Sequence, residues 1–150
     1  MTISCVATSV FIERAPYPVP ERLHQLTLSS DPVRLAATDL NLSVKITYRL
    51  AETSGERLPW SASTVAYRYT IEDRNGREID AYHWHPDGRV TIPHLHLGAA
   101  VAEGRLRPDL AGTHLPTGHV TLQEVLRMAV VELGVRPLRP DWDEVLHRSQ

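Results

Sequence analysis

Hydrophobic and polar residues alternate over two neighbouring stretches in the middle of the chain. These are residues 67–73 and 78–85, and Asn75-Gly76 lies between them. An Asn-Gly pair between two alternating stretches predicts a β-hairpin with a two-residue type I′ loop. The residues that flank the loop, Arg74 and Arg77, are then opposite each other, and the pairing continues outward from them.

This register sorts the side chains of the hairpin onto two faces, because directly opposed residues share a face. A one-residue slip would exchange the two faces, so the register is open to test. One face is aromatic and apolar and is the expected core face, with Tyr67, Tyr69, Ile71, Tyr82 and Trp84. The other face is polar, with Arg68, Thr70, His83 and His85.

A third alternating stretch, residues 90–97, predicts another strand of the same sheet. Its Leu95 and Leu97 share one face, and His94 and His96 share the other. With the leucines turned inward, both histidines join the polar face of the hairpin. Imidazoles at alternate strand positions lie about two strand rises apart, a separation that one metal ion or one phosphodiester can bridge.

A helical pattern begins near residue 121. Thr121 and Glu124 form a capping box sequence, and Gly134 is a typical C-terminal cap. We therefore expect a helix over about 121–133, followed by a short C-terminal helix that begins near Asp141. The apolar stripe of the first helix is expected to pack on the aromatic face, and contains Leu122, Val125, Leu126, Ala129, Val130 and Leu133.

The first third of the chain reads as extended. Short apolar stretches at 3–12 and 22–28 are rich in β-branched residues, and residues 40–46 alternate as in a half-buried strand. Strands followed by helices predict the α+β class, an antiparallel sheet with both helices packed on one face. The length of 150 residues predicts a single domain over 1–150.

Composition narrows the classes of function. The chain is 42% hydrophobic and 23% charged with a net charge of −2, which argues against a broad DNA-binding surface. Lys45 is the only lysine among the 16 cations. Cys5 has no second cysteine to pair with, and we expect it to be a buried core thiol. Neither a signal peptide nor an apolar stretch long enough for a membrane span is present, which predicts a cytoplasmic protein without a membrane partner.

The chemistry of imidazole gives a first interpretation of the polar face, a metal-independent ribonuclease. Histidine titrates near neutrality, so one imidazole can take the proton of a 2′-hydroxyl while another protonates the leaving oxygen. Arg68 would stabilise the charge that develops on the phosphorus centre. This interpretation needs no cofactor, and its candidate catalytic residues are His94, His96, His83, His85 and Arg68.

A second interpretation is a metal-binding module, with zinc as the typical ion for imidazole ligands. His83, His85, His94 and His96 are its first candidate ligands. His114 and His119, which flank Leu-Pro-Thr-Gly, extend the choice to three or four ligands among six histidines. The absence of a helical HExxH motif and of cysteine ligands makes such a site a nonstandard one.

A third interpretation gives the histidines no chemical role. They would then be solvent-facing strand residues of a non-catalytic interaction protein, because clustering in the sequence does not by itself require convergence in space.

The order of elements resembles the TumE-type family, small toxins of bacterial toxin–antitoxin pairs. The resemblance covers about residues 65–130 and rests on short motifs: Tyr67-Arg-Tyr69, Asn75-Gly76, Pro93-His-Leu-His96 and Thr121-Leu-Gln-Glu-Val-Leu126. This chain differs from the pattern by a longer N-terminal part, an additional His83-Trp-His85 and a second capped helix. The resemblance implies an RNA-directed toxin with an RNA substrate and an antitoxin protein as partner.

Overall fold

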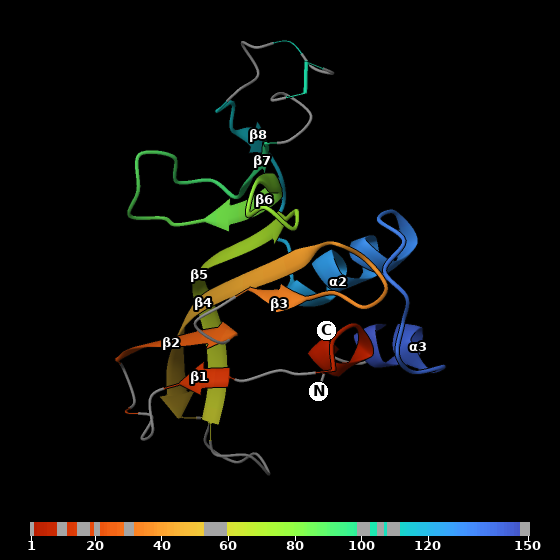
Figure 1. The fold of residues 1–150 in the computed structure, drawn as a ribbon. Coiled ribbons are helices and arrows are strands. Elements are labelled where there is room, and N and C mark those ends of the chain that lie inside the picture. The colour runs from red at the N-terminus through yellow and green to blue at the C-terminus, as the bar shows by residue number, and fades with distance from the viewer. Residues whose placement is uncertain are drawn as a thin grey trace.

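The computed structural model describes residues 2–8, 12–14, 19, 22–28, 32–52, 60–98, 103–104, 107 and 112–147. Its elements follow one another from a short 3-10 helix through eight strands to two α-helices (Figure 1). They are η1 Thr2–Cys5, β1 Ile12–Arg14, β2 Leu23–Leu28, β3 Val33–Arg34, β4 Asn41–Glu52, β5 Trp60–Glu72, β6 Glu78–Trp84, β7 His94–Leu97, β8 Leu115–Pro116, α2 Leu122–Val131 and α3 Trp142–His147.

All eight strands belong to one antiparallel sheet, in the order β1-β2-β4-β5-β6-β7-β8, with β3 paired to β4. Figure 1 shows the sheet rising from β1 to β8, with α2 and α3 on one side. The predicted α+β class with an antiparallel sheet is confirmed. Most neighbours in the sheet are also neighbours in sequence, as is usual for consecutive strands.

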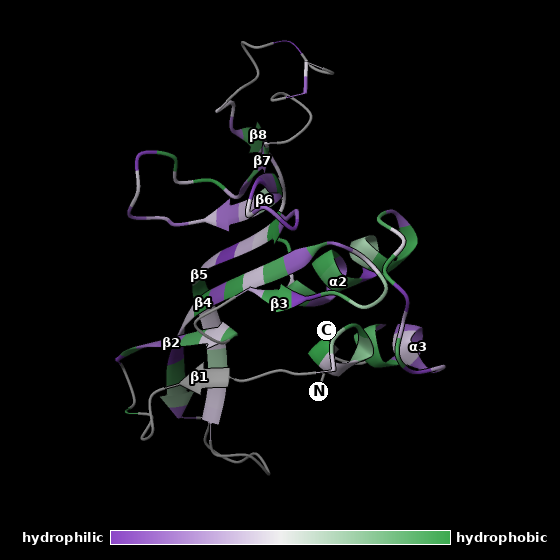
Figure 2. Cartoon of the chain, in the orientation of Figure 1, coloured by the Kyte–Doolittle hydropathy of each residue, from purple (hydrophilic) through white to green (hydrophobic). Residues whose placement is uncertain are grey.

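The core lies on the face of the sheet that turns toward α2. Leu42 is opposite Ile71 and Val44 is opposite Tyr69, and all four side chains are buried. Hydrophobic and hydrophilic residues alternate along β4 in Figure 2, as the pattern of residues 40–46 predicts. The alternation arises because successive side chains of a strand point to opposite faces.

The hairpin loop differs from the predicted type I′ turn. The Asp73 N–H donates to the carbonyl of Arg77 and the Gly76 N–H donates to that of Asp73, and Gly76 has a φ of +75°. These features define a type I turn followed by a glycine bulge, with three loop residues instead of two. The Asp73 carboxylate favours this turn because it accepts hydrogen bonds from the backbone N–H groups of Asn75 and Arg77.

The predicted pairing farther from the loop is nevertheless correct. Tyr69 lies opposite Tyr82 and Tyr67 lies opposite Trp84. The pairing changes from Glu72–Glu78 to Ile71–Asp80, which leaves Ile79 as an additional residue on β6. The loop contains one more residue than predicted, next to the end of β5. The bulge adds one residue to β6, so beyond the bulge the pairing is the same as for the predicted two-residue loop.

The helix α2 begins as predicted. The Thr121 hydroxyl accepts from the Glu124 N–H, and the Glu124 carboxylate accepts from the Thr121 N–H at 2.7 Å. At the other end Gly134 has a φ of +72°, and the Val135 N–H donates to the carbonyl of Ala129. The first pair of contacts completes a capping box, and the left-handed Gly134 ends the helical segment, so residues close in sequence determine both ends of α2.

The predicted stripe of α2 packs into the core. Val125, Leu126 and Ala129 are buried in one cluster with Tyr67 and Tyr69, and Leu122, Leu133 and Trp84 pack against it. A hydrogen bond from the Val120 N–H to the Tyr67 hydroxyl joins the start of the helix to β5. The aromatic face of the hairpin therefore contacts the helix, as the register predicts.

The expectation of an extended chain from residue 3 is wrong, because residues 2–5 form η1. Ile3, Cys5 and Val6 are buried, and the Cys5 carbonyl accepts a hydrogen bond from the Leu138 N–H. A strand would turn neighbouring side chains to opposite faces, whereas the 3-10 turn buries Cys5 and Val6 together. The C-terminal segment thus decides the local structure of the N-terminal one.

The short helix α3 lies against α2 and η1. An exposed ion pair between Arg127 and Asp143 links it to α2, and Leu146 is its buried residue. None of the helices in the described part of the chain is long and apolar enough to cross a membrane.

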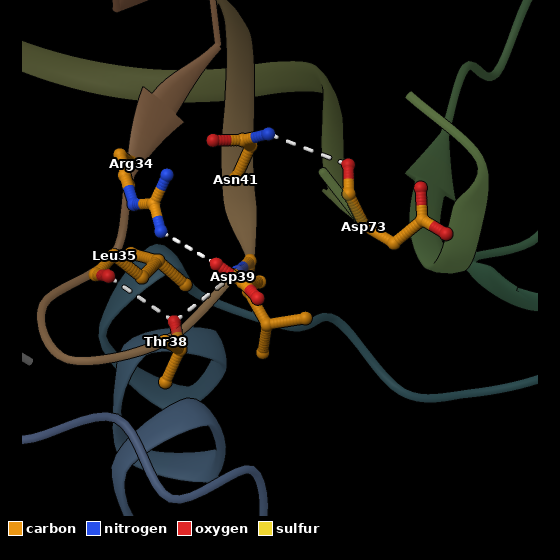
Figure 3. Close-up of polar contacts among 7 residues, drawn as sticks. Arg34, Leu35, Thr38, Asp39, Asn41 and Asp73 are labelled. Carbon is orange, nitrogen blue, oxygen red and sulfur yellow. Dashed lines mark hydrogen bonds and ion pairs between the residues drawn. The ribbon is translucent and has the colours of Figure 1, made fainter. Parts of the chain in front are cut away.

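Local hydrogen bonds fix the turn between β3 and β4 (Figure 3). The Thr38 hydroxyl donates to the Leu35 carbonyl and accepts from the Leu40 N–H, while Arg34 pairs with Asp39 at 2.6 Å. Ala37, in the middle, has a φ of +60°, a conformation that costs a non-glycine residue free energy. The surrounding hydrogen bonds offset this cost.

We predict that Leu126→Ala lowers the free energy of unfolding by about 2–5 kcal/mol, because it leaves a cavity between α2 and the sheet. Chemical denaturation followed by circular dichroism measures this change. Val131→Ala on the same helix is the matched control, since Val131 is 58% exposed. Equal stability of the wild type and Leu126→Ala would contradict the docking of α2 on the aromatic face.

Candidate functional site

Five histidine rings gather on the face of the sheet opposite α2, and we call this surface the histidine face. In the pairing of β6 with β7, His83 lies opposite His94, and Ala81 lies opposite His96. The ring centroids of His83 and His96 are 4.8 Å apart, and those of His85 and His94 are 5.3 Å apart. The shared face predicted for these four histidines is therefore observed.

The fifth ring is His114, which the strand β8 brings to the cluster. Leu115 pairs with Leu95, so the preceding His114 lies beside β7. Its ring centroid is 4.7 Å from that of His94 and 4.5 Å from that of His96. A strand of two residues has no recognisable sequence pattern. The sequence therefore identifies His114 as a candidate ligand but does not predict its position beside β7.

His119 lies outside the histidine face. Its ring contacts Trp84 at a centroid distance of 4.1 Å and Tyr67 at 6.2 Å, both on the aromatic face. Five of the six histidines in the extended ligand set therefore come together, and His119 does not.

The histidine face is built around His94, whose side chain has no exposed surface. Its Nδ1 lies 2.8 Å from the carbonyl oxygen of Ile92. A carbonyl only accepts, so Nδ1 carries the ring proton, and Nε2 of the neutral ring presents a lone pair. That Nε2 is buried and has no hydrogen-bond partner within the described part of the chain.

A second ring nitrogen has the same property. Nε2 of His83 is also buried without a hydrogen-bond partner among the described residues. One ligand nitrogen from each of His83, His94 and His96 can be chosen so that all three lie within 4.8 Å of one another. Buried polar atoms without partners are rare, and here two of them lie in one cluster of imidazoles.

Arg68 lies on the same face, directly opposite His83 on the neighbouring strand. Its Nε donates to the hydroxyl of Thr70, and its guanidinium lies 3.6 Å from the carboxylate of Glu78. The Arg68 side chain is 58% exposed. It can therefore bind an anion at the edge of the imidazole cluster.

Burial and positive neighbours keep two of the imidazoles neutral. Desolvation, followed by the charge of Arg68 and the nearby histidines, lowers the pKa of His83 from 6.5 to about 3. Desolvation also lowers the pKa of His96, with His114 as the next cause. Neutral imidazole is the form that binds a metal ion.

No family model, curated protein or solved structure that was compared matches this chain. The resemblance to the TumE-type family therefore stays a prediction.

Two other ionisable groups lie apart from this face. Cys5 is free and fully buried, and desolvation raises its pKa, which confirms the expected core thiol. Asp80, which the sequence pattern did not single out, lies on the core face opposite Ile71 and Leu97. Desolvation raises the pKa of its carboxyl to about 6.

We predict that His83 makes the metal-free protein less stable as the pH falls from about 6.5 toward 3. In that range the unfolded chain binds a proton at His83 that the folded chain does not, so unfolding becomes more favourable. Above pH 6.5 this contribution to stability is complete. Asp80 has the opposite sign between about 4 and 6, because its folded pKa is raised.

The measurement compares the wild type with His83→Gln, in the presence of a chelator, by urea unfolding at several pH values. The comparison removes the effect of Asp80, which both proteins share. The free energy of unfolding of the variant should fall less steeply with decreasing pH. Parallel curves would contradict the lowered pKa of His83.

Proposed function

We propose that the protein binds one transition-metal ion, with zinc as the favoured ion, through His83, His94 and His96. The observation that carries the proposal is the pair of buried Nε2 atoms, on His83 and His94, that have no partner among the described residues. A metal ion would satisfy both at once, and zinc binds neutral imidazole nitrogen at 2.0–2.1 Å. The ligand nitrogens lie within 4.8 Å of one another, and zinc would draw them to about 3.3 Å, the spacing of a tetrahedral site.

The surroundings of His94 support the same proposal. A metal-binding histidine usually donates its second ring N–H to a carbonyl or carboxylate, which fixes the tautomer and the direction of the lone pair. The hydrogen bond from Nδ1 of His94 to the Ile92 carbonyl has this form. His94 is also fully buried, so its ring is held in place before any ion binds.

Three protein ligands leave one coordination position for water or a substrate, which is typical of catalytic rather than structural zinc sites. Zinc in such a site lowers the pKa of a bound water to about 7 and supplies a nucleophile for hydrolysis. The ligand set contains no carboxylate, and Arg68 adds a further positive charge. This charge balance favours an anionic substrate.

We predict that the chelator-treated protein binds about one zinc ion per chain, and that His94→Ala weakens binding about 100-fold or more. Loss of an outer hydrogen-bond partner alone costs 10–100-fold in affinity, and loss of a ligand costs at least as much. Calorimetric titration with zinc measures both. His119→Ala is the matched control, because its ring lies on the aromatic face. Failure of the wild type to bind zinc would overturn the proposal.

A second candidate function is the metal-independent ribonuclease, as a toxin with an antitoxin partner in the cytoplasm. The position of Arg68 opposite His83 supports it, as do the exposed rings of His85 and His114. An exposed imidazole can exchange protons with solvent and substrate, and the guanidinium can stabilise charge on a phosphate. Both candidates use the same face, and chelation distinguishes them.

If the second candidate holds, RNA cleavage survives a chelator and follows a bell-shaped pH profile. His85→Ala and His96→Ala should each lower the rate by about two to four orders of magnitude, the usual scale for a lost general acid or base, whereas the fully buried His94 has no surface from which to exchange a proton with substrate. Arg68→Ala should lower the rate without moving the pH optimum. Cleavage of a labelled RNA measures these effects, and arrested growth on expression of the gene alone tests the toxin. Cleavage that stops with a chelator and returns with zinc would exclude this candidate.

A further inference from the structure

A row of cationic and imidazole side chains crosses four adjacent strands of the histidine face. Lys45 on β4 pairs with Arg68 on β5, Arg68 pairs with His83 on β6, and His83 pairs with His94 on β7. Directly paired residues share a face, so the four side chains form one line across the sheet. At about 4.8 Å per strand, the line extends about 14 Å from Lys45 to His94.

A hollow of about 300 Å³ accompanies the cationic end of this row. It opens beside the candidate metal site, because the ring of its lining residue His85 lies 5.3 Å from that of His94. The side chains of Lys45 and Arg68 are exposed, so their charges are accessible from solvent. Among the residues that line the hollow are Gln25, Lys45, Thr47, Arg68, Trp84 and His85.

We propose that this row binds a single nucleic-acid strand, with one phosphate at the histidines and a neighbouring phosphate between Lys45 and Arg68. The cations are spread along a line rather than gathered around one point. A ligand with a single phosphate would contact only one end of the row, whereas a phosphodiester strand carries charges at regular intervals along its length. The proposal rests on the proposed function for the position of the reacting phosphate.

The polarity of the hollow suits such a strand. Lys45 supplies a point charge and Arg68 a planar guanidinium, which are the two common phosphate-binding groups. Glu78 contacts Arg68 at 3.6 Å, and the guanidinium retains donors for a phosphate on its exposed side.

The test measures binding of fluorescent eight-nucleotide oligouridylate and oligothymidylate by anisotropy over a series of salt concentrations. Chelator is present, so that binding is read without cleavage at a metal centre. For the wild type, the affinity should fall linearly with salt on logarithmic axes, with a slope of about 0.7 for each neutralised phosphate. Lys45→Gln should reduce that slope by about 0.7 and weaken binding at low salt. Stronger binding of oligouridylate than of oligothymidylate would identify the ligand as RNA. Equal binding would mean that the protein binds single-stranded RNA and DNA alike.

Arg136→Gln is the matched control, since it removes one exposed positive charge from the segment after α2. It should leave the slope unchanged. Equal slopes for the wild type and Lys45→Gln, or binding of uridine monophosphate as tight as that of the oligonucleotide, would overturn the proposal. Zinc content is measured on the same preparations after loading with zinc and before the chelator is added. If the wild type contains one zinc per chain but does not bind the strand, only this inference is refuted. If the wild type does not bind zinc, the proposed function is refuted.

Discussion

The pairing of β6 with β5 on one side and β7 on the other is the constraint on which both faces of the protein depend. It places Tyr82 between Tyr69 and Leu95, and His83 between Arg68 and His94. Because side chains alternate along a strand, one register places the aromatic residues on the face that packs against α2 and the histidines on the opposite face. The core and the candidate site are two results of a single set of backbone hydrogen bonds.

This arrangement separates stability from chemistry. The free energy of folding comes mainly from the face that packs against α2, where Tyr67, Leu126 and Ile71 are buried. The histidine face contributes fewer apolar contacts and contains buried nitrogens without partners among the described residues. Such atoms reduce stability, and a structure that keeps them in place is typical of a functional site. The net charge of −2 does not reveal this face, because it averages the cations near β4 to β7 with acids elsewhere.

The sequence predicts the α+β class, the ends of α2 and the four-histidine cluster, because each depends on local periodicity or capping residues. Long-range contacts account for the differences. Leu138 and Ala36 determine that the segment of Cys5 and Val6 turns back on itself. His114 enters the cluster through a strand of two residues, too short for a pattern to reveal, and His119 turns toward Trp84. Lys45 reaches the row of cations only through the pairing of β4 with β5, which no local signal contains.

The two irregularities of the hairpin have a consequence for how this protein can change during evolution. The three-residue loop and the additional Ile79 together keep His83 on the side of Arg68. Shortening the loop alone would move the rest of β6 by one position and turn its histidines toward the core. Loop length and the presence of the bulge are therefore inherited as a pair. Homologous chains that keep the imidazole cluster should have either both features or neither.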